Sequence, residues 1–328
     1  MDPPISYVVG SQLESLEIYR GIAPVSVAQE SIGGAIDAKI SKGNFGAGQD
    51  FELAGRAIGS TQSVNNGYNL NASVYGSNNR HRLKLAALTD QGDDADFSGG
   101  TITPTEYERQ RYDIGYGVRT GGHTLQFDYG NNDTGDSGTP ALPMDIRYIR
   151  GDLYNFGYRF EANAQTEVEM AIYGSELRHS MDNYRLRQPP GDADNWRRNT
   201  ARSDNLGFRL QGTRRDDRGT WRLGLDGFGA NHDSDIDNPN NPMFFVTNFN
   251  AAEREVVGAY LERQQDFETR WRGEFGLRYN HVSMDAGEVN GTPARRPPAM
   301  ALRDAFNAAD REQTDNNIDL VAKAWYQA

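Results

Sequence analysis

The stretch Tyr68-Asn69-Leu70-Asn71-Ala72-Ser73-Val74 decides the fold of this chain. Apolar and polar side chains alternate along it, and successive side chains of a strand point to opposite faces of a sheet. This period of two therefore predicts a strand with one apolar and one polar face. Similar alternation recurs at residues 83–85, 112–118, 125–129, 154–160, 168–172, 206–210, 221–225, 257–261 and 275–279. The sequence predicts an all-β protein with about twelve strands from Asp50 onward.

The connectors between these strands are alternately short and long. The short polar ones are residues 77–79, 119–122, 161–164, 214–218 and 264–266, and the long polar ones are residues 90–105, 131–145, 179–203, 231–251 and 283–315. Short polar connectors close hairpins. Short turns at one end and long loops at the other are typical of an outer-membrane barrel, whereas a soluble sandwich has no reason for this asymmetry. We therefore expect antiparallel transmembrane strands in the cell outer membrane of a Gram-negative bacterium, surrounded by lipid.

The composition agrees with a barrel. The mean hydropathy of −0.75 is low, but only one face of each barrel strand meets lipid and the loops are hydrophilic. No apolar run reaches the roughly 20 residues of a membrane-spanning helix. The 16 Tyr, 14 Phe and 4 Trp suit the aromatic girdles of a barrel, with cross-strand packing in a soluble sheet as the alternative.

Charge and motifs exclude several functions. The net charge of −12 argues against binding of nucleic acid, and the lack of cysteine excludes disulfides and thiolate metal sites within this chain. No nucleophile elbow, phosphate loop or His-Glu-x-x-His motif is present, so we expect no enzyme. The acidic residues 90–96 lack the twelve-residue calcium-loop pattern and are expected to form a solvated loop.

A segment of different character precedes the strands. Glu17-Ile18-Tyr19-Arg20-Gly21 is followed by Gly33-Gly34, and this pair of motifs resembles the end of the plug domain of TonB-dependent outer-membrane receptors, although Ile22 stands where the family usually has Pro. The resemblance implies that residues 1–47 are the C-terminal part of a plug domain and residues 48–328 the N-terminal part of the barrel. Family barrels have about 22 strands, so the expected fold is a partial barrel with a plug remnant. With no signal peptide and a last strand that runs to the final residues, the chain looks cut at both ends.

Two further stretches resemble the copper receptors of that family. They are Met1-Asp2-Pro3-Pro4 and His179-Ser180-Met181. The resemblance implies that Met1, His179 and Met181 meet above the plug and hold a copper ion. Thioether sulfur selects Cu(I) and imidazole suits copper. In an extended loop His179 and Met181, two residues apart, would point the same way. Met144 is expected to pack its own loop, and the other histidines, His81, His123, His232 and His281, to be solvated.

The resemblance implies active uptake of copper, with the ion as transported ligand and no catalytic cofactor. The implied partner is TonB with its inner-membrane energising complex, acting through a segment that would precede this chain. Two alternatives stay open. One is a receptor for a siderophore or another organic ligand, whose site would be dominated by aromatic and Arg residues of the long loops. The other is a passive porin-like barrel or adhesin without a plug.

Overall fold

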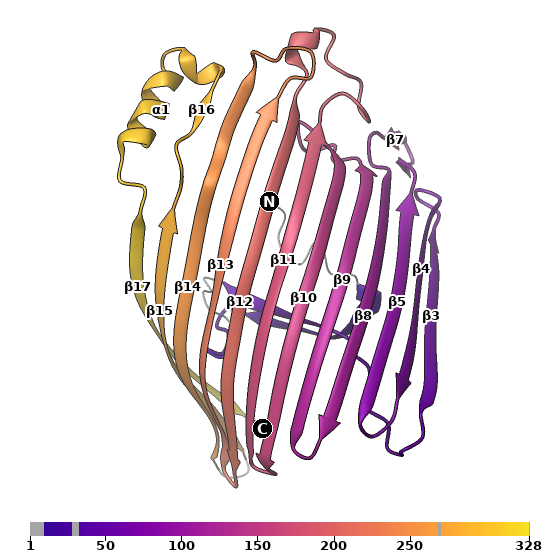
Figure 1. Ribbon diagram of the computed structural model, residues 1–328, viewed down its shortest axis with the longest axis vertical. Helices are drawn as coiled ribbons and strands as arrows, with labels where there is room; N and C mark the ends of the chain where they lie inside the picture. Colours follow the sequence, from indigo (N-terminus) through magenta and orange to yellow (C-terminus); the bar gives the residue numbers. More distant parts are fainter. Residues whose placement is uncertain (1–9, 28–32, 268–269, 328) are drawn as a thin grey trace.

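The computed structural model describes residues 10–27, 33–267 and 270–327 (Figure 1). Twelve long strands of the described residues form one antiparallel sheet in which each long strand pairs with the next along the chain. Their bounds are β3 Glu52–Gln62, β4 Gly67–Ser77, β5 His81–Gly92, β8 Tyr107–Thr120, β9 His123–Ser137, β10 Asp145–Asn163, β11 Thr166–Asp182, β12 Arg198–Asp216, β13 Gly219–Asp237, β14 Phe245–Phe267, β15 Trp271–Asp285 and β17 Gln313–Tyr326. The predicted antiparallel array is confirmed.

The remaining elements of the described residues are shorter or lie outside this path of long strands. They are η2 Gly10–Gln12, β1 Leu13–Arg20, β2 Gly34–Ile40, β6 Ala95–Phe97, β7 Gly100–Ile102, η3 Ala193–Asn195, β16 Asn290–Gly291, η4 Pro293–Arg295 and α1 Ala299–Ala308. Among the described residues, no helix is both long enough and apolar enough to cross a membrane. The long connectors gather at the upper end of the sheet in Figure 1 and the tight turns at the lower end.

The strands are longer than their alternation predicts, and the loops are correspondingly shorter. The connector expected at residues 179–203 is a loop only at residues 183–197, because β11 continues to Asp182 and β12 begins at Arg198. Above the apolar part of the sheet the outward face carries charged side chains instead of apolar ones, so the alternation of apolar and polar residues ends there. Backbone pairing between the strands nevertheless continues, as in the register of Met181 with Asn199.

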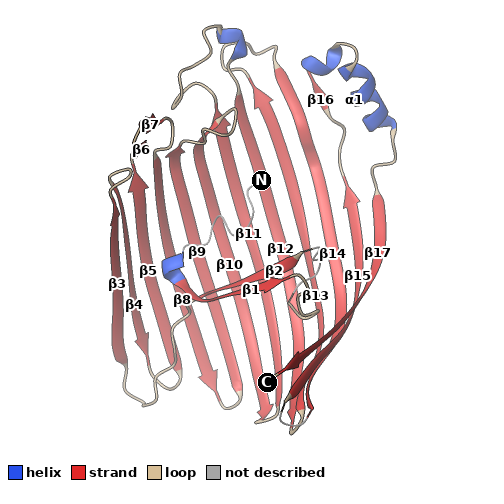
Figure 2. Cartoon of the chain, turned by 180° about the vertical axis from the view of Figure 1, so that it is seen from behind, coloured by secondary structure: helices blue, strands red, loops and turns tan. Residues whose placement is uncertain are grey.

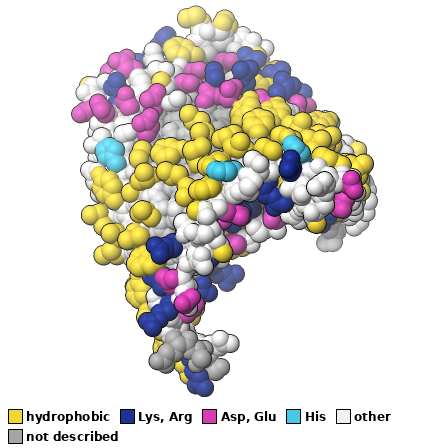
Figure 3. Space-filling view, turned by 60° about the horizontal axis from the view of Figure 1, so that its bottom comes forward, with side chains coloured by type: hydrophobic (Ala, Val, Ile, Leu, Met, Phe, Trp, Pro, Cys, Tyr) yellow, Lys and Arg dark blue, Asp and Glu magenta, His cyan; other side chains and the backbone are white. Residues whose placement is uncertain are grey.

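The sheet is apolar on its outward face and polar on its inward face. Leu206 and Leu223 point outward and are 65% and 64% exposed, and a broad band of hydrophobic side chains covers this face (Figure 3). Inward, Glu262, Arg278 and Asn280 are almost completely buried. An apolar belt around a polar interior is the arrangement of a transmembrane barrel.

Two cross-strand rows of charge lie above the apolar band on the outward face. The lower row is Asp152, Glu176 and Asp204, and the upper row is Arg150, Arg178 and Arg202. The rows pair with each other, as in the 2.8 Å contact between Arg202 Nε and Asp204 Oδ2. Charges at this density belong in water or at lipid headgroups. We therefore expect the upper edge of the lipid layer at the lower row, that of Asp152, Glu176 and Asp204.

The first part of the chain lies on the inward side of the sheet. β1 and β2 form a separate antiparallel pair that crosses the concave face (Figure 2). We call residues 10–27 and 33–47 the lumenal segment. The concave face and this segment together frame the candidate site.

The outward face gives a direct test of depth. Leu225→Arg should lower the free energy of unfolding by about 2–4 kcal/mol, because Leu225 lies within the apolar band of β13. Asn231→Arg is the matched control on the same face of the same strand, above the band, and should change the free energy by less than about 1 kcal/mol. Urea titration of the protein folded in lipid vesicles measures both. Equal effects at the two positions would contradict the membrane placement.

Candidate functional site

Barrel side chains hold one end of the lumenal segment by its backbone and by Gln12. Lys84 Nζ donates to the carbonyl of Ser41 at 2.7 Å, and Arg82 Nη1 donates to the carbonyl of Gly43 at 2.8 Å. Gln12 Nε2 donates to Asp113 Oδ2 at 3.0 Å. The contacts come from β5 and β8, so the segment is fastened across neighbouring strands.

A second attachment holds the turn at Val25 and Ser26. The backbone N–H of Ser26 donates to Glu262 Oε2 at 3.2 Å, and its carbonyl accepts from Arg209 Nη2 at 2.9 Å. Arg278 Nη1 donates to the carbonyl of Val25 at 3.0 Å. Glu262 is 0% and Arg278 1% exposed. Buried charges need partners, and here the turn supplies part of the set.

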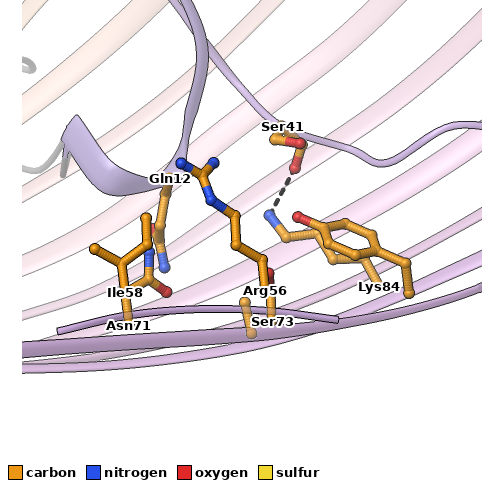
Figure 4. A pocket seen from close by; sticks show the side chains of 9 residues that line it. Gln12, Ser41, Arg56, Ile58, Asn71, Ser73 and Lys84 are labelled. Atoms are coloured by element: carbon orange, nitrogen blue, oxygen red, sulfur yellow. Dashed lines mark hydrogen bonds between the residues drawn. The ribbon is translucent and has the colours of Figure 1, made fainter. Parts of the chain in front are cut away.

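A small polar cavity separates the lumenal segment from β3, β4 and β5 (Figure 4). Its volume of about 20 Å³ has room for about one water molecule. Arg56 and Lys84 line it, and the dashed contact in Figure 4 joins Lys84 to Ser41. The buried Oε1 of Gln12, another lining residue, has no hydrogen-bond partner among the described residues. The segment therefore rests on polar, hydratable surface here.

His179 and Met181 lie on the inward face of β11. The sequence analysis placed them in an extended loop; they are instead strand residues, with His179 opposite Ile149 of β10 and Ala201 of β12. Because they are two residues apart on one strand, their side chains share a face. The reason for the difference is the extension of β11 above the apolar band. Met1, the third predicted ligand, lies outside the described residues.

His179 is buried beside a small apolar cluster. His179 is 6% exposed, and the neighbouring inward residues Ile149 and Leu177 form a buried hydrophobic cluster with Ile146 packed against it. Over the described ranges no group of three or more His, Cys, Asp or Glu side chains is placed to hold a metal ion. On this face of β11, His179 presents an imidazole and Met181 a thioether.

One arginine joins two of the loops above the site. Arg187 Nε and Nη2 donate to the two carboxylate oxygens of Asp145 at 2.6 and 2.7 Å. Arg187 Nη1 also donates to the carbonyl of Leu142 at 2.8 Å. Loop 183–197 thereby holds loop 138–144, which carries Met144. Sequence reasoning missed this contact because the partners are 42 residues apart and follow no periodic pattern.

The Asp145 carboxyl has a lowered pKa. Burial raises it, but the hydrogen bonds from Arg187 and from the backbone N–H of Thr139 outweigh burial and bring the pKa below its ordinary value. Asp145 is the first residue of β10, at the loop end of the sheet and outside the apolar band. The contact with Arg187 therefore involves the charged form of the carboxyl.

Comparisons with known proteins bear on this fold. No protein-family model matches the sequence. No curated protein matches it. Among solved structures, the copper transporter OprC has a TM-score of 0.79 at 19% identity, over 98% of this chain and 49% of that one. The hemophore receptor HasR of Serratia marcescens has a TM-score of 0.67 at 15% identity, over 97% and 47%. The ferric citrate transporter FecA has a TM-score of 0.63 at 13% identity, over 98% and 48%.

The chain thus spans about half the length of the solved structures that it matches. At these identities the likeness shows the fold. The chain has the fold of about half of the β-barrel of these structures, which confirms the predicted fold class at the level of the barrel.

Replacing the loop arginine tests this part of the site. Arg187→Gln should make local opening of loop 138–144 easier by about 1.5–3 kcal/mol, the usual contribution of hydrogen bonds to charged groups. Arg185→Gln is the control, because Arg185 and its partner Asp136 are both well exposed and such a pair contributes at most about 1 kcal/mol. Hydrogen exchange of the loop measures both variants.

The same contact should depend on pH. The folded pKa of Asp145 lies below the unfolded value, so the contact stabilises the loop fully above about pH 4 and loses its effect as the pH falls through the lowered folded pKa. The difference between the natural protein and Arg187→Gln should therefore shrink in acid. A difference that stays constant down to the acid limit of folding would contradict the role of the Asp145 carboxylate.

Proposed function

We propose that this chain is part of a TonB-dependent outer-membrane receptor for the active uptake of copper. Residues 1–47 would form the C-terminal part of its plug domain and residues 48–328 the N-terminal part of its barrel. One observation carries the proposal: His179 and Met181 stand on the same inward face of β11, and His179 is buried beside the apolar cluster of Ile149 and Leu177. The fold shared with OprC, a protein named as a copper transporter, agrees with it.

The donor pair favours a soft cation. Thioether sulfur and imidazole nitrogen bind Cu(I), whereas hard cations such as Mg²⁺ and Ca²⁺ require several oxygen ligands. A strand paired on both sides holds the two side chains more firmly than a loop would. Met1 is the proposed third ligand. Copper is in this proposal the transported substrate.

The lumenal segment supports gated rather than passive transport. It crosses the concave face and is held there by the polar contacts of Ser41, Gly43, Val25 and Ser26 (Figure 2). TonB, driven by the energising complex of the inner membrane, would pull on the plug and open a path. Hydrogen bonds suit such a movement, because water can replace each of them when the segment shifts. A passive porin would carry no such segment.

The loop aromatics favour a metal over an organic chelate. Tyr184 and Trp196 stack on each other with ring centroids 4.7 Å apart, and Trp196 Nε1 donates to the carbonyl of Pro190 at 3.0 Å. Arg197 lies over the ring of Phe244 at 3.7 Å. These groups are engaged with one another within the loops, whereas an organic-ligand site would direct them at its ligand.

The donor pair is tested by substitution. His179→Ala with Met181→Leu should reduce the copper bound per purified protein at least about tenfold, since both soft donors are lost. Met170→Leu is the matched control, because Met170 is on the same strand but on its outward face, opposite Tyr158. Elemental analysis after washing with a chelator measures the bound copper. Unchanged copper in the double variant would refute the metal assignment, and tight binding of a siderophore would favour the organic-ligand alternative.

The gate is tested by a disulfide. An added Cβ at Gly276 would lie 3.3 Å from the Cβ of Val25, slightly below the usual spacing in disulfides and within reach of a small backbone shift. In this cysteine-free chain, Val25→Cys with Gly276→Cys should crosslink under oxidation and stop copper uptake by cells, and a reducing agent should restore it. The single variants are controls. Full uptake by the crosslinked protein would show that this part of the lumenal segment need not move.

A further inference from the structure

His232 is the inward-facing histidine that the candidate site does not use. The sequence analysis expected it to be solvated beside a long loop, but it lies within β13, directly opposite Ser203 of β12. Its neighbours on the strand, Asn231 and Asp233, point outward above the apolar band. His232 therefore faces the same interior as His179 and Met181.

The three side chains descend the inward face in steps. Cross-strand pairing from β11 through β12 to β13 defines three rows, which are Met181–Asn199–Ile236, His179–Ala201–Ser234 and Leu177–Ser203–His232. Each row lies two residues farther from the loops than the row before. The direction is fixed because β13 runs from the turn end at Gly219 to the loop end at Asp237. His232 is thus the deepest of the three donors.

Within the described part of the chain, two buried polar atoms of this lowest row have no hydrogen-bond partner. Nδ1 of His232 and Oγ of Ser203 are both buried, and neither has a hydrogen-bond partner among the described residues. Ser203 is only 1% exposed. Buried polar atoms without partners are uncommon in folded proteins and call for an explanation such as a bound ion or water.

The spacing permits transfer between the two histidines. The two histidines are separated by two strand spacings of about 4.8 Å each and by a rise of two residues along the strand, about 6.8 Å. Their Cα atoms are therefore about 12 Å apart. Two imidazole rings directed at each other, with a metal ion about 2 Å from each nitrogen, can span such a distance on a concave face.

We propose that His232 forms a second binding site for copper and receives the ion from the site of His179 and Met181. In the transfer, a bond from His232 nitrogen to Cu(I) forms as the bond from Met181 sulfur breaks, while the bonds from His179 and from the proposed third ligand Met1 are kept. The metal remains Cu(I) and no electron moves. This inference rests on the proposed function and adds to it the first inward step of the ion.

The variant His232→Gln removes the donor with little change in volume. It should keep the affinity of the first site within about twofold, because His179 and Met181 are untouched, yet slow copper uptake by cells at least about tenfold. His232→Met should restore uptake, because a thioether also binds Cu(I). His281→Gln is the control, since His281 faces outward on β15 and its Nδ1 bonds Asn316 Oδ1 at 3.0 Å.

Two measurements separate the outcomes, a Cu(I) titration against a competing chelator and the rate of copper uptake. Uptake by His232→Gln equal to that of His281→Gln would overturn the inference and leave the proposed function intact. So would a His232→Met protein that folds but is as slow as His232→Gln, because the loss would then come from packing. If the variants of His179 and Met181 bind copper normally, the proposed function itself fails.

Discussion

The structure depends on one constraint, the pairing of each long strand between the edge strands β3 and β17 in register with two neighbours while its faces meet opposite surroundings. In lipid each backbone N–H and C=O must be bonded within the sheet, because no water is there to replace a missing partner. A slip of one residue would turn the apolar face of a strand inward. Leu206 and Leu223 fix the outward face of their strands. The register then determines which residues of each neighbouring strand face inward. The orientation of His179 and Met181 follows from that of residues far below them.

The inward face buries charged side chains, which is unfavourable unless they have partners. The lumenal segment supplies some of these partners. Arg278 and Glu262 are almost fully enclosed, and removing one partner from such a set usually costs about 3–5 kcal/mol. Asp226 pairs with Arg278, and Arg222 with Glu262, so the sheet satisfies part of the need itself. The backbone adds further partners, since the carbonyl of Val25 accepts from Arg278 and the N–H of Ser26 donates to Glu262. A segment held in this way is positioned specifically and is still attached by bonds that water can replace.

The sequence was most informative where lipid imposes a two-residue period. Alternation located the strands and predicted a polar face on them, and the structure buries polar residues such as Arg111 and Gln211 on that face. It was misleading above the apolar band, where pairing continues without a lipid-facing side, and so His179 was expected in a loop. The bond between Arg187 and Asp145 and the depth of His232 depend on loop folding and on cross-strand register, neither of which leaves a local pattern. The role of Met1 stays a prediction.

The central claim is that soft donors of this inward face bind the transported ion. X-ray absorption spectroscopy of the purified protein loaded with Cu(I) tests it most directly, because the technique reports the atoms bound to the metal. The account predicts a first shell that contains both sulfur and imidazole nitrogen, and loss of the sulfur contribution when Met181 is replaced by Leu. A shell of oxygen and nitrogen alone in the natural protein, or a sulfur signal that survives Met181→Leu unchanged, would contradict it.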